Sequence, residues 1–340
     1  MFRDQLRVFL EKECTPASVR ARWETETGRS AELWGKLAEM GLLGLRAEER
    51  FGGLGMDEVD FVLLFEEAGR VALPEPLLET AAVGVPLLAE IGGDLAGTWL
   101  PRVTTGEAIL TIGHGLSPVV ADAHVADLLL LEREGALWAA PREAVTMVAQ
   151  PCSDASRRLF VVEMDPGSLE PVARGGACAE LMAAATDRGA LATAGFQIGL
   201  AERMVELAVE YAGQREQFGK PIGSFQAIKH MLASVAVAIE FARPLAYRAA
   251  HAVARGEVSR PVDVSQANAA ASDAALLAAR TALQVHGAIG YTWEVDLHLW
   301  MKRAWALESA WGSRRWHRRR IAAALLDSDV APTFGFGAAL

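Results

Sequence analysis

The segment Arg215-Glu-Gln-Phe-Gly-Lys-Pro-Ile-Gly-Ser-Phe-Gln-Ala-Ile-Lys-His230 interrupts a long helical pattern, and Gln284-Val-His-Gly-Ala-Ile-Gly290 interrupts it again further along. Arg215 falls at a predicted helix end, and its planar guanidinium suits a pyrophosphate because it makes paired charge-assisted hydrogen bonds. Taken alone, the residue is better explained as a solvated arginine favoured by the helix C-terminus. Gly287 is likewise either a helix cap or a point of close backbone approach to a ligand.

Helical periodicity on both sides of these segments predicts a helical bundle. We expect four long helices, over residues 191–212, 225–255, 262–286 and 294–326. Long helices in succession favour an antiparallel four-helix bundle, here over residues 173–327. Residues 328–340 are expected to form a loose tail.

The rest of the chain divides into a helical and a β part. Residues 1–108 have the pattern of short helices and loops, with Ser30 and Asp57 as capping side chains at two helix starts. Residues 109–172 contain short apolar runs with breaks between them, which predicts a shortened β domain of four or five strands. These runs cover residues 126–131, 137–140, 145–148 and 159–162. The predicted fold class is therefore mainly α with a small β domain.

Composition excludes several classes of function. A formal net charge of -10 disfavours nonspecific binding to nucleic acid. Cys14, Cys152 and Cys178 are odd in number and widely spaced, which predicts a reducing compartment and no structural metal. The charged N-terminus is not typical of a signal peptide, and no apolar run is long enough for a membrane span. We therefore expect a cytoplasmic protein with no bound metal.

The two segments quoted first resemble the C-terminal half of the acyl-CoA dehydrogenase family. Phe51-Gly-Gly-Leu-Gly-Met56, Glu66-Glu-Ala-Gly-Arg-Val-Ala72 and Leu100-Pro-Arg-Val-Thr-Thr-Gly-Glu107 resemble signposts of its N-terminal half. The resemblance covers roughly residues 30–325 of this chain. It implies an N-terminal helical domain, a middle β domain and a C-terminal four-helix bundle.

The resemblance also implies an FAD site. In the family, the arginine, the aromatic residue after it and the glutamine–glycine turn reach across a subunit interface to the flavin of a neighbouring chain. The matching residues here are Arg215, Phe218, Gln284, Val285, His286, Gly287 and Ala288. Ala288 stands where the family often has a second glycine, so the approach of this backbone to the ADP moiety is altered.

The carboxylate that the family uses as its base is missing from both places where it is expected. The family places this glutamate at one of two sequence positions that converge in space, and these correspond to Gly189 and Trp311. Neither side chain accepts a proton. The nearest acids, Asp187 and Glu308, lie two and three residues away, and a helix cap or surface acid explains each of them well. No catalytic residue is therefore predicted in this chain.

The shortened β domain lacks the family's two strings that cradle the flavin ring and the acyl chain. The chain thus retains one half of a shared site, which predicts an isolated chain that is inactive. A full-length acyl-CoA dehydrogenase subunit would supply the base and the flavin-ring platform in an α2β2 heterotetramer. The pattern resembles that of actinobacterial acyl-CoA dehydrogenases acting on steroid side chains, with an electron-transfer flavoprotein as the family's acceptor. The alternatives are an autonomous homodimer with a displaced base, Asp187 or Glu308, and a structural subunit that binds no flavin.

Overall fold

The N-terminal helices begin where the sequence offers capping side chains. The structure is a computed structural model that describes residues 2–165, 167 and 169–326, so the predicted tail at 328–340 lies outside the described residues. Ser30 Oγ accepts a hydrogen bond from the Leu33 amide (3.1 Å), and the Asp57 carboxylate accepts one from the Val59 amide (2.9 Å). Both bonds satisfy amides that a helix start leaves unpaired, which confirms the two predicted helix starts.

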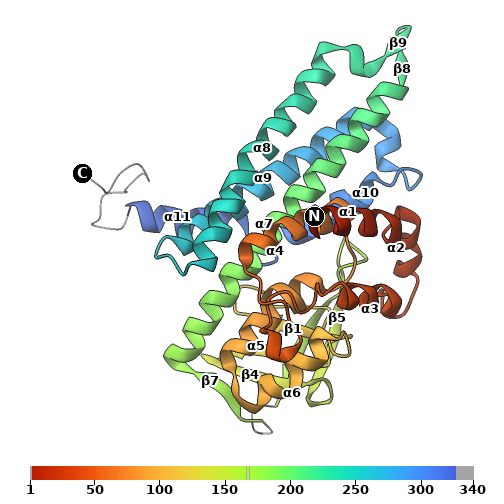
Figure 1. Cartoon of the computed structure of the whole chain (residues 1–340). Helices are drawn as coiled ribbons and strands as arrows, with labels where there is room; N and C mark the ends of the chain where they lie inside the picture. The colour runs from red at the N-terminus through yellow and green to blue at the C-terminus, as the bar shows by residue number, and fades with distance from the viewer. Residues whose placement is uncertain (1, 166, 168, 327–340) are drawn as a thin grey trace.

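Short helices make up the N-terminal part of the chain (Figure 1). They are α1 (Phe2–Glu13), α2 (Pro16–Trp23), α3 (Ala31–Glu39), η1 (Glu49–Phe51), α4 (Glu58–Arg70), η2 (Leu78–Gly84), α5 (Val85–Ile91) and α6 (Gly93–Thr104). Element η2 is a short π-helix and all of its residues are buried. Such π-helical turns are rare and occur often at functional sites.

Two small sheets follow, with more strands than the four or five predicted. The strands are β1 (Leu110–Gly113), β2 (Val120–Ala121), β3 (Leu128–Arg133), β4 (Ala136–Pro141), β5 (Val145–Gln150), β6 (Leu159–Met164) and β7 (Pro171–Arg174), with the turn η3 (Arg142–Ala144). One sheet has the order β1-β3-β4-β7 and the other β2-β6-β5. The four predicted apolar runs are β3 to β6; the additional strands are two to four residues long, too short to show a period.

Strand β3 explains the run of four consecutive leucines. Leu128 and Leu130 pack into the core shared with the helices, whereas Leu129 and Leu131 pack into a second core formed by the β region. Successive side chains of a strand point to opposite faces, so a strand covered on both faces has no polar positions. Strand β3 thereby packs the β region against the N-terminal and C-terminal helices through Leu128 and Leu130.

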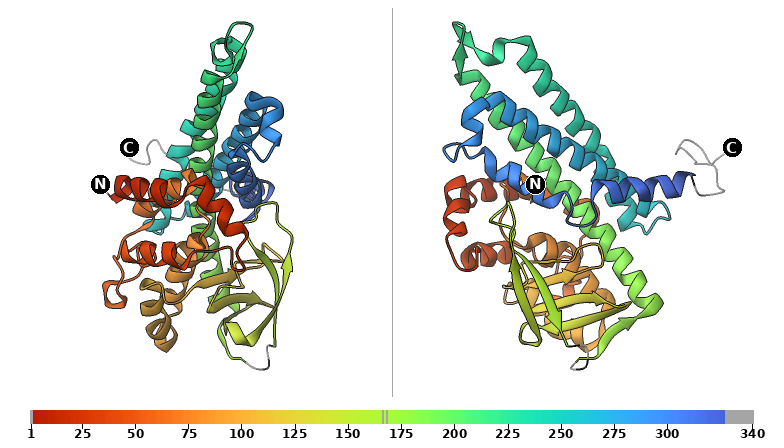
Figure 2. Two further views of the ribbon diagram at one scale, coloured as in Figure 1. Left: turned by 90° about the vertical axis from the view of Figure 1, so that its right-hand side faces the viewer. Right: turned by 180° about the vertical axis from the view of Figure 1, so that it is seen from behind.

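Helix α7 (Gly175–Gln214) connects the β region to the bundle and is 40 residues long, well beyond the predicted 191–212. At about 1.5 Å per residue it extends roughly 60 Å. It runs from the end of β7 up to a hairpin at the far end of the molecule (Figures 1 and 2). Beyond the hairpin lie η5 (Ile222–Ser224), α8 (Gln226–Ala254) and α9 (Arg260–His286). Helices α7, α8 and α9 pack side by side and confirm the helical bundle.

The predicted single helix over 294–326 is wrong. The chain forms η6 (Gly287–Tyr291), α10 (Leu297–Leu307) and α11 (Arg314–Leu326) instead. The break at 308–313 contains Gly312 with a φ of +102°, a conformation that favours glycine. The break matters because it turns Trp311 into the interior, where the indole is 1% exposed.

A glycine pair holds the N-terminal helices close to the bundle. A Cβ atom on Gly199 of α7 would lie 1.9 Å from the carbonyl oxygen of Glu66 in α4. A Cβ atom on Gly69 of α4 would lie 2.0 Å from the carbonyl oxygen of Phe196 in α7. Both backbones approach so closely that only glycine fits, which fixes how α4 crosses α7. No helix in the described part of the chain is both long and apolar enough to cross a membrane.

Candidate functional site

The predicted flavin-binding residues lie at the far end of the bundle, at the end of α7. Arg215 follows α7 and is exposed, and it forms no ion pair with the described residues. Strands β8 (Glu216–Gln217) and β9 (Lys220–Pro221) form a hairpin whose turn residues, Phe218 and Gly219, have φ values of +55° and +76°. Phe218 is 92% exposed. The hairpin therefore presents a cation and an aromatic ring to solvent.

The turn after α9 lies at the same end of the bundle. The ring of His286 stacks on Tyr211 of α7 at 4.5 Å, which joins the end of α9 to the end of α7. Gly287 has a φ of +63°, and no atom lies within 4 Å of the Cβ position it leaves empty. Because Gly287 has no side chain on this open side, a ligand can approach its backbone closely.

Only part of the predicted set faces outward. Gln284, Gly287 and Ala288 are exposed, whereas the side chains of Val285 and His286 are buried. Burial lowers the pKa of His286, and Nδ1 donates to the Ala282 carbonyl at 2.7 Å. The side chains of Val285 and His286 therefore pack into the bundle on the inner side of the turn. A ligand on the outer side would contact the backbone of the turn.

Gly189 and Trp311, the two positions predicted to correspond to the family's base, lie against each other in the interior. A Cβ atom on Gly189 would lie 2.2 Å from Cδ2 of Trp311, whereas carbon atoms in contact are normally about 3.5–4.0 Å apart. The indole of Trp311 therefore occupies the space into which a side chain at position 189 would project.

Trp311 is held on every side by buried groups. Its Nε1 donates to the Glu79 carboxylate at 3.1 Å, and its ring stacks on His114 at 4.1 Å. His317, itself fully buried, donates from Nε2 to the Trp311 carbonyl at 3.1 Å. Burial lowers the pKa of His114 to about 4 and that of His317 to about 4, so both rings are neutral. The indole is a fixed part of the core.

Both nearby acids are bound to arginines. Asp187 is fully buried and accepts hydrogen bonds from Arg260 Nε (2.8 Å) and Arg320 Nη1 (2.7 Å). It lies two residues before Gly189, which turns it roughly 200° around the helix from that position.

Glu308 is likewise committed to an ion pair. Its carboxylate accepts hydrogen bonds from Arg314 Nε at 3.1 Å and from the Arg314 amide at 3.3 Å. Neither acid therefore stands free beside the space that Trp311 fills.

Buried ion pairs fill the rest of this interior. Arg157 pairs with Glu79 at 3.1 Å, and two further pairs join Arg303 to Asp154 and Arg29 to Asp122. The cavity left among them is only about 20 Å³, which is about enough for one water molecule. No room remains there for an acyl group.

Sequence reasoning did not identify this buried network. Its one visible signal is Glu79, a single acid in the otherwise uncharged stretch 77–83. Burial raises the pKa of Glu79, and the charge of Arg157 opposes that shift. Its partners are Arg157 from the β region and Trp311 from the break between α10 and α11, both far away in sequence, so periodicity alone does not connect them.

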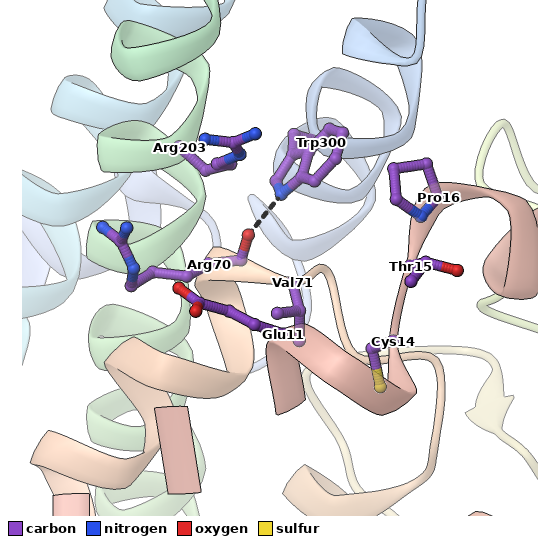
Figure 3. A pocket seen from close by; sticks show the side chains of 8 residues that line it. All are labelled: Glu11, Cys14, Thr15, Pro16, Arg70, Val71, Arg203 and Trp300. Carbon is purple, nitrogen blue, oxygen red and sulfur yellow. Dashed lines mark hydrogen bonds between the residues drawn. The ribbon is translucent and has the colours of Figure 1, made fainter. Parts of the chain in front are cut away.

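A separate cavity of about 330 Å³ lies between α1, α4, α7 and α10 (Figure 3). Trp300 Nε1 donates to the Arg70 carbonyl across it at 2.8 Å. Its arginines are occupied, because Arg70 pairs with Glu202 and Glu206, and Arg203 pairs with Glu206.

The chemistry of this cavity offers no reactive group. Burial raises the pKa of the Cys14 thiol to about 11, so it is protonated at neutral pH and a poor nucleophile. Among the described residues, no cluster of three or more His, Cys, Asp or Glu side chains is placed to hold a metal ion.

This order of N-terminal helices, small β region and C-terminal bundle is that of acyl-CoA dehydrogenases. The variant structure of the steroid ACAD Tcur3481-Tcur3483 has the same fold, with a TM-score of 0.87 at 23% identity over 96% of this chain and 97% of that one. The ChsE4-ChsE5 complex of Mycobacterium tuberculosis gives 0.86 at 27% identity over 97% of each chain.

The sequence places the chain in the same family. The acyl-CoA dehydrogenase N-terminal domain matches residues 1–107 and the C-terminal domain matches residues 179–326. Acyl-CoA dehydrogenase IpdE2 of Mycobacterium tuberculosis is 36% identical over 89% of this chain and 90% of its own length. The chain belongs to the acyl-CoA dehydrogenase family, whose members are FAD-dependent oxidoreductases.

A double-mutant cycle tests whether Trp311 occupies the side-chain space of position 189. We expect Gly189→Ala to destabilise the chain by about 1–3 kcal/mol through overpacking, and Trp311→Ala by about 3–5 kcal/mol. In the double variant, the alanine introduced at position 189 enters the vacated space. The cost of that alanine therefore falls by at least about 1 kcal/mol, measured by urea unfolding.

The matched control for that cycle is Gly213→Ala, at an exposed position of the same helix with no atom within 4 Å of its missing Cβ. This change is expected to leave stability unchanged or to raise it by up to about 1 kcal/mol. Equal effects of the alanines at positions 189 and 213 would contradict the assignment.

The buried acids predict a pH-dependent stability. Burial raises the pKa of Glu75 to about 7, while its carboxylate accepts from the Ser30 amide at 3.1 Å. The folded chain therefore keeps a proton that the unfolded chain releases above its ordinary pKa of 4.5, and stability is lost as pH rises towards 7. Glu75→Gln cannot ionise and keeps an acceptor for Ser30. Its stability relative to wild type should rise by roughly 2 kcal/mol between pH 5 and pH 8 in thermal or urea unfolding; a constant difference would contradict this account.

Proposed function

We propose that this chain is the base-less subunit of a heteromeric, FAD-dependent acyl-CoA dehydrogenase. The observation that carries the proposal is the contact of Trp311 with Gly189. Abstraction of the α proton of an acyl-CoA thioester requires a carboxylate within hydrogen-bond reach of the α carbon. A glycine covered by an indole offers none, and the neighbouring acids Asp187 and Glu308 are held by arginines.

The interior next to Trp311 further supports an isolated chain that is inactive. A substrate pocket is typically several hundred Å³, against roughly 20 Å³ among the buried ion pairs of Glu79 and Arg303. A more open pocket of about 330 Å³ lies beside His114 and Arg320, outside this network of ion pairs. Opening the smaller space would separate the buried Glu79–Arg157 pair, which is costly because both charges would lose their partner without reaching bulk water. We place the acyl group in the other subunit, next to the base that this chain would lack.

The exposed end of the bundle fits half of an FAD site. Arg215 has no ion-pair partner among the described residues, and Gly287 leaves its open side free of atoms. Arg215 would pair with the pyrophosphate, Phe218 would cover part of the flavin, and the backbone from Gln284 to Ala288 would contact the ADP moiety. Bound FAD supplies the acceptor for the hydride from the β carbon of the thioester. The part played by this chain is to bind and orient the cofactor.

The remaining parts would come from a full-length acyl-CoA dehydrogenase subunit in an α2β2 heterotetramer with two flavins. The ChsE4-ChsE5 complex, similar to this chain at 27% identity, supports an assembly of two unlike chains. A steroid side chain is the candidate acyl group, by analogy with the steroid ACAD of the same fold. An electron-transfer flavoprotein is the proposed acceptor of the electrons, and the cytoplasm the proposed location.

Two alternatives carry different expectations. A homodimer with a displaced base requires Asp187 or Glu308 to leave its arginines, and predicts flavin and turnover in the isolated chain. A structural subunit that binds no flavin leaves the unpaired Arg215 and the open Gly287 turn without a role.

Arg215→Ala tests the cofactor role. In the heteromeric complex we expect this variant to lose most of its bound FAD after gel filtration, with the native mass unchanged, because the loss of a charged hydrogen-bond partner weakens cofactor binding without changing the fold. The matched control is Arg255→Ala, an exposed arginine at the end of α8, the opposite end of the bundle. Equal FAD content in both variants and the wild type would favour the structural subunit.

A further inference from the structure

Trp293 is a large aromatic side chain that the fold holds in place at the surface. It lies between η6 and α10 and is 62% exposed. The edge of the Trp23 ring from α2 contacts it at a centroid distance of 6.2 Å, and Lys302 Nζ lies 4.0 Å from the ring centre. A cation over the face of an indole is attracted to the ring and adds to the support of this side chain.

The backbone at Trp293 is held as firmly as its ring. Arg20 of α2 donates from Nη1 to the Trp293 carbonyl at 2.8 Å and from Nε to the Asp296 carboxylate at 2.8 Å. The His298 ring contacts the indole at a centroid distance of 4.6 Å and lies 5.7 Å from the Trp23 ring, so the three rings form one cluster. A side chain that is already immobilised loses little conformational entropy when a partner covers it, which is the property of an anchor residue at a protein interface.

Lys302 is a cation that forms no ion pair with any described residue at this surface. Arg20 beside it is paired with Asp296, but no carboxylate of the described residues forms an ion pair with Lys302. Burial lowers the pKa of Lys302, the charge of Asp154 opposes that shift and the charge of Arg20 adds to it, while the side chain stays partly accessible. A carboxylate from a second molecule would satisfy this charge.

The position of this surface indicates what covers it. Trp293 follows the Gly287–Ala288 turn on the same loop, and Tyr291 between them is 79% exposed. A subunit that brings its flavin to Gly287 therefore lies within a few residues of Trp293. Tryptophan and tyrosine are the side chains most enriched at interface centres.

We propose that Trp293, Tyr291 and Lys302 form the docking surface for the flavin-bearing subunit. That subunit would receive the indole in an apolar pocket and place a carboxylate against Lys302. This inference rests on the proposed heteromer, and it adds which residues hold the two unlike chains together.

The test uses this chain and a full-length acyl-CoA dehydrogenase from the same organism that co-purifies with it. Trp293→Ala is expected to raise the dissociation constant of the complex at least tenfold, as loss of an anchor residue does. Trp99→Ala is the matched control, because Arg102 lies 4.6 Å over its ring on α6, in the N-terminal helical part. A second variant, Lys302→Met, keeps most of the stem and is expected to weaken binding at low salt far more than at high salt.

The outcomes separate the inference from the function on which it rests. The docking surface is supported if the wild-type chain forms the heteromer, the Trp293 and Lys302 variants bind the partner more weakly, and the Trp99 variant binds it with unchanged affinity. If the wild-type chain forms the heteromer and both variants bind the partner with unchanged affinity and salt dependence, the docking surface is overturned and the proposed function stays intact. A wild-type chain that forms no heteromer and binds flavin alone overturns both.

Discussion

The contact between Trp311 and Gly189 determines what the interior of this protein can do. The indole of Trp311 covers Gly189 so closely that any side chain at position 189 would clash with it. The break between α10 and α11, with Gly312 in a conformation that favours glycine, is what turns the indole inward. Glu79 and His114 then fit around the indole and complete a filled core.

The arrangement of charges divides the molecule in the same way. In the interior, Arg29, Arg157 and Arg303 are each paired with a buried carboxylate. The exposed Arg215 at the end of the bundle and the partly accessible Lys302 on α10 form no such ion pair among the described residues. Paired buried charges maintain a structure, whereas unpaired exposed cations are available to an anionic cofactor or a second protein. The paired charges thus lie in the interior, and these two cations without an ion pair lie at the surface.

The sequence predicted the parts of the fold that depend on local pattern. Ser30 and Asp57 cap helices as expected, and the apolar runs of the middle segment are strands because successive leucines of β3 fill two cores. The single helix predicted over 294–326 failed because periodicity continues across Gly312, and only its backbone conformation breaks the helix.

The candidate site was predictable to a similar extent. Gly189 and Trp311 were identified through the family resemblance, and the structure brings them together. The Glu79–Arg157 pair escaped detection because its members come from a π-helix and a loop that share no motif. Similarly, nothing local marks Trp293 as an anchor, since its support comes from Arg20 and Trp23 near the start of the chain.

The central claim is that this chain carries half of a flavin site and no base, and one measurement addresses it directly. The flavin absorbance and native mass are recorded for the isolated chain and for the chain co-expressed with full-length acyl-CoA dehydrogenases from the same organism. The account predicts a colourless isolated chain and a yellow heterotetramer with one flavin for each pair of unlike chains. An isolated chain that is yellow and is reduced by an acyl-CoA would contradict it, and would make Asp187 the first residue to substitute.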